Sequence, residues 1–427
     1  LFAVHPMRVE SVVWVTERKD VLFGAFYLAA FSCYLRYLWG KRKDKKWLYF
    51  ALALFVPSLL AKIQAVFLPL SMLAADFYFR RPLRWKLIWE KIPFFLLSLI
   101  SCLVGIYFLR VQGSLGTPDE VAAAAGLGKR LLIGAYSLVI YLLKFVYPWE
   151  MSPLYPYPAD LDWKFYVAPL PALAFLGLTV WVFLKKYRIL TFGLTFFLFN
   201  IVMMLQILGA GQGFIADRFT YIAYFGLFFI VGMFVEKWQT ERPGMRSWLL
   251  GGVAIYLLLL MFTTWRQVKI WKDSEVMWTH VLKYYDRNPT AWRNRGHHLR
   301  ESGRVEEGLK DLQKAMTLAP DDATLLNSLG KTYFDRKEYA KALDSYNQAI
   351  EKDQTIGEIY VNRGAAHGML GNIQAALQDM NRGLELDPEH INGYLNRSLV
   401  HYNLGNFQEA NQDLTTYLGY RPNNPDI

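Results

Sequence analysis

The sequence contains only two cysteines and seven histidines in 427 residues. Cys33 and Cys102 lie inside apolar runs, so they provide neither a disulfide framework nor a metal site. We find no metal-ligand spacing, no phosphate-binding glycine loop and no Ser/His/Asp arrangement, and His5 alone does not indicate catalysis. The sequence therefore indicates no divalent metal, and it predicts no disulfide-stabilised fold.

Acidic residues are scarce before the last third of the chain. From Val281 to Ile427 there are 17 Lys and Arg against 20 Asp and Glu, a net charge of −3, so the preceding part carries +14. That basic excess clusters at the ends of apolar runs, as it does in membrane proteins. We expect membrane lipid, and no nucleic acid, as a partner.

Apolar residues make up 54% of the chain and occur in long blocks. A spanning helix needs about 20 such residues, or fewer where Lys, Arg or Trp snorkels at its ends. Eight runs fit: 21–38, 47–61, 64–79, 92–110, 166–185, 189–209, 218–236 and 248–265. The sequence predicts a polytopic helical membrane domain over residues 1–270, and because the chain begins within an apolar run and lacks a signal peptide, we expect earlier spans to be missing.

Four basic loops orient these runs, since positive residues flank cytoplasmic ends. They are residues 36–47, 80–86, 185–188 and 236–246. If all four are cytoplasmic, the opening "HPMRVESVVWVTERKD", the hairpin tip at Lys62, the loop "GAGQGFIADRFTY" and everything after Trp265 face the opposite side. An alternative places one basic loop outside.

A ninth apolar run, residues 131–149, has no crossing to make in that arrangement. Lys129, Arg130 and Lys144 in and around it make full burial costly. We therefore expect a re-entrant or interfacial helix.

Charged residues at the outer membrane edge are candidate site residues, because unpaired charge there is expensive. On a helix, Glu10 and Glu17 share a face that either holds a polar substrate or forms ordinary internal ion pairs. Lys62 occupies a hairpin tip where Gly or Asn is usual. Arg218, after Asp217, either binds a lipid-linked phosphate or snorkels at the interface.

A 34-residue period begins at Pro289. Gly296, Gly330, Gly364 and Ser398 recur at this spacing, as do small residues at Gly308, Ala342, Ala376 and Ala410. This is the tetratricopeptide (TPR) pattern, with small residues where paired helices approach. The sequence predicts a connecting helix at 271–288 and an array of four repeats at 289–427, and the final "NNPDI" looks like the start of a fifth.

TPR arrays present a groove to proteins or peptides. Polar residues recur in register on the first helices of the repeats, in the triplets "NRG", "NRG" and "NRS". These polar residues form either a carboxylate-binding groove or a solvated helix face. They are Arg293, Asn294, Arg295, Asn362, Arg363, Asn396 and Arg397.

Four motifs occur in order before the repeats: "FAVHPMRVESVVWVTERKDVL", "AKIQAVFLPLSMLAADF", "YPWEMSPLYPYP" and "GQGFIADRFTYIAYFGLF". With the repeats, they resemble bacterial membrane TPR proteins, which in turn resemble the eukaryotic transmembrane-and-TPR protein O-mannosyltransferases. The resemblance implies an all-α glycosyltransferase C fold followed by a TPR solenoid. It also implies transfer of mannose or a related hexose from a polyprenyl-phosphate sugar to Ser/Thr on the non-cytoplasmic side, with the acceptor protein in the TPR groove.

The same resemblance assigns residues. It implies that Lys62, Asp217, Arg218 and Tyr221 bind the donor lipid phosphate and sugar, and that a cavity is lined by His5, Arg8, Glu10, Arg18, Lys19 and Asp20. The family's catalytic acids lie in an earlier outer loop, so we expect the base upstream of Leu1 and an inactive fragment. The expected location is the bacterial inner membrane with the repeats outside. The alternative is a non-enzymatic, membrane-anchored TPR scaffold of the cell envelope.

Overall fold

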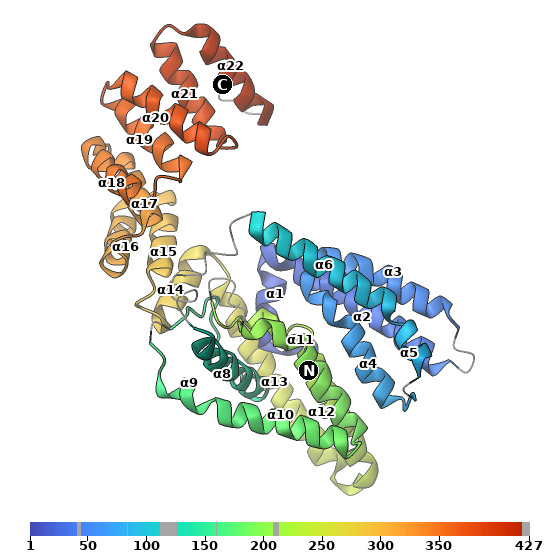
Figure 1. Cartoon of the computed structure of the whole chain (residues 1–427). Coiled ribbons are helices and arrows are strands. Elements are labelled where there is room, and N and C mark those ends of the chain that lie inside the picture. Colours follow the sequence, from blue (N-terminus) through green and yellow to red (C-terminus); the bar gives the residue numbers. More distant parts are fainter. Residues whose placement is uncertain (41–43, 83, 112–125, 159, 208–212, 421–427) are drawn as a thin grey trace. The chain divides into compact units, whose positions relative to one another are not determined.

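The computed structural model describes residues 1–40, 44–82, 84–111, 126–158, 160–207 and 213–420. Within these ranges all regular structure is helical, apart from one isolated bridge between Tyr155 and Ile215. The predicted all-α class is confirmed (Figure 1). The chain divides into two compact units, Leu1–Lys272 and Asp273–Ile427, and each is described by itself.

The first unit opens with short helical turns. Pro6 occupies the first position of its turn, where its missing N–H costs nothing. Trp14 then takes an extended backbone (φ −76°, ψ 109°), which separates the next two turns. The expected continuous helix through Glu10 and Glu17 is therefore wrong. The turns are η1 (Phe2–Val4), η2 (Pro6–Arg8), α1 (Val9–Val13) and η3 (Val15–Glu17).

Longer helices follow in the first unit. The earlier set is α2 (Arg18–Trp39), α3 (Lys46–Ala61), η4 (Ile63–Phe67), α4 (Leu68–Tyr78), α5 (Trp85–Trp89) and α6 (Ile92–Val111). The later set is α8 (Leu127–Val146), α9 (Trp163–Val167), α10 (Pro169–Leu184), α11 (Arg188–Ile201), η5 (Val202–Leu205), η6 (Asp217–Thr220), α12 (Tyr224–Glu241), η7 (Pro243–Met245) and α13 (Arg246–Ile270).

Among the described residues, four helical stretches are long and apolar enough to cross a membrane: Val15–Trp39, Trp163–Leu184, Arg188–Leu205 and Pro243–Ile270. Three shorter apolar stretches match the expected runs at 47–61, 64–79 and 92–110: Lys46–Ala61, Ile63–Tyr78 and Ile92–Phe108. The span expected from residue 218 is wrong at its start, because η6 occupies Asp217–Thr220 and α12 begins only at Tyr224. The last turns of α12 also carry Glu236, Lys237 and Glu241.

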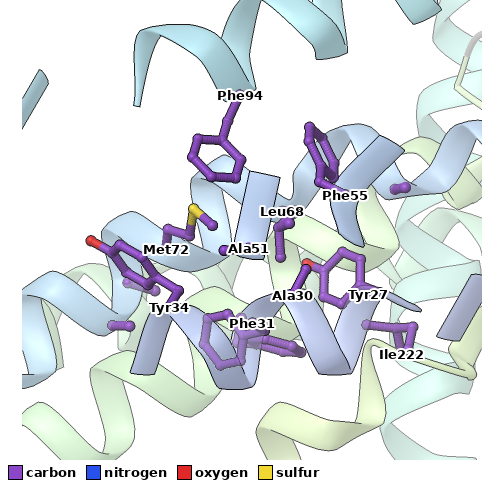
Figure 2. Packing of buried hydrophobic residues seen from close by; sticks show 14 of the residues in the cluster. Tyr27, Ala30, Phe31, Tyr34, Ala51, Phe55, Leu68, Met72, Phe94 and Ile222 are labelled. Carbon is purple, nitrogen blue, oxygen red and sulfur yellow. The ribbon is translucent and has the colours of Figure 1, made fainter. Parts of the chain in front are cut away.

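A buried apolar cluster holds the early helices together (Figure 2). Tyr27, Phe31 and Tyr34 recur every three or four residues along α2, so they lie on one face of the helix. Side chains of α3, α4 and α6 pack against that face. Ala30 and Ala51 are fully buried, and such small side chains let helices approach closely.

The second unit contains α14 (Ser274–Tyr284) and four helix pairs. The pairs are α15 (Pro289–Glu301) with α16 (Val305–Leu318), α17 (Ala323–Asp335) with α18 (Tyr339–Lys352), α19 (Gly357–Met369) with α20 (Ile373–Leu386), and α21 (Ile391–Asn403) with α22 (Phe407–Tyr420). The small residues lie where paired helices meet, since a Cβ on Gly308 would be 2.6 Å from the Gly296 carbonyl oxygen. The helix expected as a connector over 271–288 appears as α14, within this unit.

Candidate functional site

Arg218 is held by the opening segment of the chain. Its backbone N–H donates to Glu10 Oε2 at 2.8 Å, and its guanidinium forms an ion pair with the same carboxylate. Arg218 Nε also lies 3.5 Å from Glu17 Oε1. The guanidinium stacks over Trp14, 5.3 Å from the ring centroid. A rigid fork of donors is thus fixed in orientation by Glu10, Glu17 and Trp14.

Glu10 is 3% exposed. Burial raises the pKa of its carboxyl to about 7, although the nearby Arg218 acts in the opposite direction. The ion pair between Glu10 and Arg218 is therefore expected to weaken as the pH falls and the carboxyl takes up a proton.

Lys62 lies in the same cluster. Its extended backbone (φ −159°, ψ 134°) ends α3, and its ammonium forms an ion pair with Asp20. The ammonium is also 3.7 Å from Glu17 Oε2, while Ser11 Oγ donates to Asp20 at 3.1 Å. Glu17 therefore lies between Lys62 and Arg218, the two cations predicted to bind a lipid phosphate.

Asp217 lies next to Arg218 in sequence but contacts a different set of residues. Its Oδ1 accepts a hydrogen bond from the Tyr155 hydroxyl at 2.8 Å and lies 3.5 Å from Lys144 Nζ. Lys144 also donates to Tyr155 and to the Glu150 carbonyl. The charge of Lys144, expected to oppose burial of this helix, is neutralised by Asp217. Asp217 thus links η6 to α8 through Lys144.

Arg8 is buried among aromatic rings. Its guanidinium carbon lies 5.3 Å from the ring centroids of Phe2, Tyr221 and Tyr224, and Nη2 donates to Thr220. Within the described ranges, Nε and Nη1 of Arg8 have no hydrogen-bond partner. Tyr221, expected beside the donor, therefore packs on Arg8.

The remaining residues of the opening motif, His5, Arg18 and Lys19, differ in burial and in hydrogen-bond partners. The His5 ring accepts from the Met7 N–H at Nδ1, so Nε2 carries the proton and donates to the Phe145 carbonyl at 3.2 Å. Lys19 reaches Glu17 at 3.6 Å but is largely exposed. Arg18 is exposed and donates to the Val15 carbonyl, so it does not join the cluster.

Sequence reasoning missed a second buried charged cluster, which joins α2, α4 and the α5–α6 region. Asp76 lies 2.5 Å from Lys91 Nζ and 3.0 Å from Arg81 Nη1, and it accepts from Tyr34 at 2.6 Å. Arg81 continues to Glu90 at 2.8 Å. Tyr34 and Asp76 come from α2 and α4, and the other partners from the connections on either side of α5, so no helical spacing in the sequence indicated the cluster.

Three of the repeat arginines, Arg295, Arg363 and Arg397, are paired with carboxylates of the array. Each pairs through two nitrogens with an aspartate of its own repeat, and the closest distances are 2.7 Å (Arg295–Asp311), 2.6 Å (Arg363–Asp379) and 2.7 Å (Arg397–Asp413). In the remaining repeat the corresponding positions are Leu329 and Ser345, so both members of the pair are replaced together.

The same arginines also contact the preceding helix. Nη1 donates to Thr279, Asn347 and Asn381, respectively. Arg293 reaches the next repeat at Thr324 and Asp322, and Asn362 donates to Asn327 at 2.9 Å. Asn294 and Asn396 are half-buried at the position equivalent to Asn362. In the described ranges, no group of three or more His, Cys, Asp or Glu side chains is arranged to hold a metal ion.

The fold and these sites define a helical integral membrane protein that carries a TPR solenoid. Residues 288–355 and 357–390 match family models described as tetratricopeptide repeat. Over most of its length the chain is similar to proteins named as protein O-mannosyl-transferases of the TMTC3 type. It is 26% identical to Protein O-mannosyl-transferase Tmtc3 of Drosophila melanogaster over 414 residues, covering 82% of this chain and 43% of that protein. The human TMTC3 protein is 26% identical over 396 residues, covering 82% and 42%.

The chain thus spans less than half the length of these curated relatives. Among solved structures, the crystal structure of MamA matches with a TM-score of 0.31 and 20% identity, covering 35% of this chain and 86% of that one. The first TPR of Spaghetti (RPAP3) bound to an HSP90 peptide matches with a TM-score of 0.27 and 24% identity, covering 27% and 93%.

Proposed function

We propose that this protein is a membrane glycosyltransferase, or a large part of one, that transfers mannose or a related hexose from a polyprenyl-phosphate sugar to Ser/Thr of proteins. The observation that carries the proposal is the pair of cations, Lys62 and Arg218, placed on either side of Glu17. It occurs in a chain that aligns with protein O-mannosyl-transferases over 82% of its length.

The chemistry requires charge stabilisation at the leaving phosphate. The acceptor hydroxyl oxygen bonds to the anomeric carbon, the bond from that carbon to the phosphate oxygen breaks, and a base takes the hydroxyl proton. Arg218 and Lys62 neutralise the phosphate as it leaves, and their carboxylate partners hold both cations in position before donor arrives. Glu10 and Asp20 are each engaged by one of these cations, so we assign the base to neither.

From the distribution of positive charge we place the basic loops in the cytoplasm and the repeats on the outer side. The bacterial inner membrane is the location implied by the resemblance to bacterial membrane TPR proteins. The TPR groove then receives the acceptor protein. Arg293, Asn294, Asn362 and Asn396 are the proposed contact residues, whereas Arg295, Arg363 and Arg397 hold the helices in register.

The test is sugar transfer by the full-length protein in membranes, with labelled polyprenyl-phosphate mannose and an acceptor protein. Arg218→Ala is expected to lower transfer by at least about 100-fold, because a charge-assisted contact to the leaving group is lost. Arg246→Ala is the control, since Arg246 is exposed and lies outside the cluster. Transfer by Arg218→Ala at the level of the control would refute the assigned role.

The second candidate is a non-enzymatic membrane-anchored TPR scaffold. It is favoured by the fact that Lys62 and Arg218 are both already paired with carboxylates. A scaffold predicts no transfer by the full-length protein with any polyprenyl-phosphate hexose, while an envelope protein still binds the repeats.

A further inference from the structure

A cavity of about 720 Å³ opens in the first unit between the end of α4, the α10–α11 turn and α12. Its apolar lining includes Tyr78, Phe79, Ile230, Met233 and Phe234. Tyr78 also contacts the ring of Phe229, with 5.6 Å between the ring centroids. The cavity is therefore suited to hydrocarbon.

Three cations complete the lining: Lys186, Arg188 and Lys237. They come from the α10–α11 turn and from α12, both at basic ends of apolar helices. Lys186 and Lys237 are exposed. Lys237 forms an ion pair with exposed Glu241, at 3.7 Å, and such surface pairs are weak. Positive charge thus borders the apolar wall.

The backbone of Lys186 closes α10. It adopts φ +59°, the left-handed conformation that commonly closes a helix and that normally selects glycine. The Tyr187 N–H donates to the Val182 carbonyl, and the Lys186 N–H to that of Phe183, which completes this helix-closing motif. Arg80 and Lys337 close their helices in the same way, so the conformation explains the turn, and it places the exposed Lys186 on the lining of the cavity.

We propose that this cavity binds an anionic phospholipid, with the headgroup phosphate at Lys186, Arg188 and Lys237 and an acyl chain against Met233 and Phe234. A phospholipid combines the two properties that the lining presents, an anion joined to hydrocarbon. Basic pockets between membrane helices are known to hold such headgroups. The site lies at the basic-loop ends of the helices, apart from the Lys62–Arg218 cluster, and does not depend on the proposed transferase activity.

The test measures phospholipid bound to the purified whole chain in detergent by native mass spectrometry, with phosphatidylglycerol and phosphatidylcholine as probes. The wild type is expected to retain phosphatidylglycerol in preference to phosphatidylcholine. The double variant Lys186→Gly/Lys237→Gln is expected to bind phosphatidylglycerol at least about tenfold more weakly, because two charged contacts are lost. Lys185→Gln is the matched control, since the neighbouring Lys185 does not line the cavity.

Glycine adopts the left-handed conformation without strain, so Lys186→Gly separates lipid binding from folding. As a second variant, Met233→Trp fills the apolar part of the cavity without changing charge, and it is expected to displace the lipid. Equal binding of the two lipids by the wild type, or unchanged phosphatidylglycerol binding by both variants, would overturn the proposal. Displacement of bound phosphatidylglycerol by inorganic phosphate alone would also overturn it, because the site would then recognise an anion without its hydrocarbon.

Discussion

Lys144 of α8 and Asp217 of η6 form an ion pair with 3.5 Å between Nζ and Oδ1, and their side chains are 3% and 4% exposed. The pair connects α8 with η6, the turn that also contains Arg218. Burying two charges is tolerated when they are paired and hydrogen-bonded, and Tyr155 supplies the additional bond. The position of Arg218 therefore depends on α8.

Removal of one member of this pair is expected to destabilise the protein strongly. Lys144→Met leaves Asp217 as an unpaired buried charge, which costs about 3–5 kcal/mol. The double variant Lys144→Met/Asp217→Asn is expected to recover part of that loss. Unfolding of the purified chain in detergent measures it, with exposed Lys129→Met as a control that changes stability by less than about 0.5 kcal/mol. Equal stability of Lys144→Met and Lys129→Met would contradict the role of the pair.

Gly226 permits the close approach of α12 to α11. A Cβ on Gly226 would lie 2.3 Å from the Gly193 carbonyl oxygen and 3.0 Å from the Phe197 backbone nitrogen, and neither backbone atom moves easily. Gly226→Ala is expected to cost at least about 1–3 kcal/mol through overpacking. Gly232→Ala in the same helix has open space around the added methyl and is expected to be neutral or slightly stabilising. The melting temperatures of both variants, measured in the same detergent, test this expectation. Identical melting temperatures would show that α11 and α12 move apart without loss of stability.

Glu10 is expected to make stability pH-dependent. Its pKa in the folded protein, about 7, is above the ordinary value of 4.5, so the folded state binds more protons between these values. Stability then falls as pH rises from 4.5 to 7, by at most about 3 kcal/mol from this group. In Glu10→Gln this contribution is absent. Chemical unfolding of both proteins across this pH range is the measurement, and parallel curves would contradict the raised pKa.

The repeat lacking an Arg–Asp pair offers a direct test of that pair. Leu329→Arg alone places a charge beside Ser345 with no aspartate opposite it, whereas Leu329→Arg/Ser345→Asp recreates the arrangement of Arg363 and Asp379. The double variant is expected to be more stable than the single variant by about 1–3 kcal/mol. Hydrogen exchange of α17 and α18 in the full chain reports the difference locally. Equal protection in the two variants would mean that the pair contributes nothing.

Much of the fold follows from local pattern. The 34-residue period placed Gly296 and Gly308 at a helix contact, and the structure confirms this because only small side chains fit there. Most apolar runs became helices near the expected bounds. The start of the span at residue 218 was wrong because hydropathy averages over a window and does not register a short turn at Asp217–Thr220. Glu10 and Glu17 both contact Arg218. They do so through the tertiary fold and not as neighbours on one helix, because the extended backbone of Trp14 separates them.

The sequence by itself determined the helical class, the division into an apolar basic part and a repeat array, and the residue types available to bind phosphate. Those properties depend on composition and on spacing along one helix, which the chain carries locally. Only the tertiary structure decided which charges meet. These pairings join separate elements of the fold, and spacing along the chain does not encode the distance between such elements. They are Glu17 with Lys62 and Arg218, Lys144 with Asp217, and the repeat arginines with their aspartates.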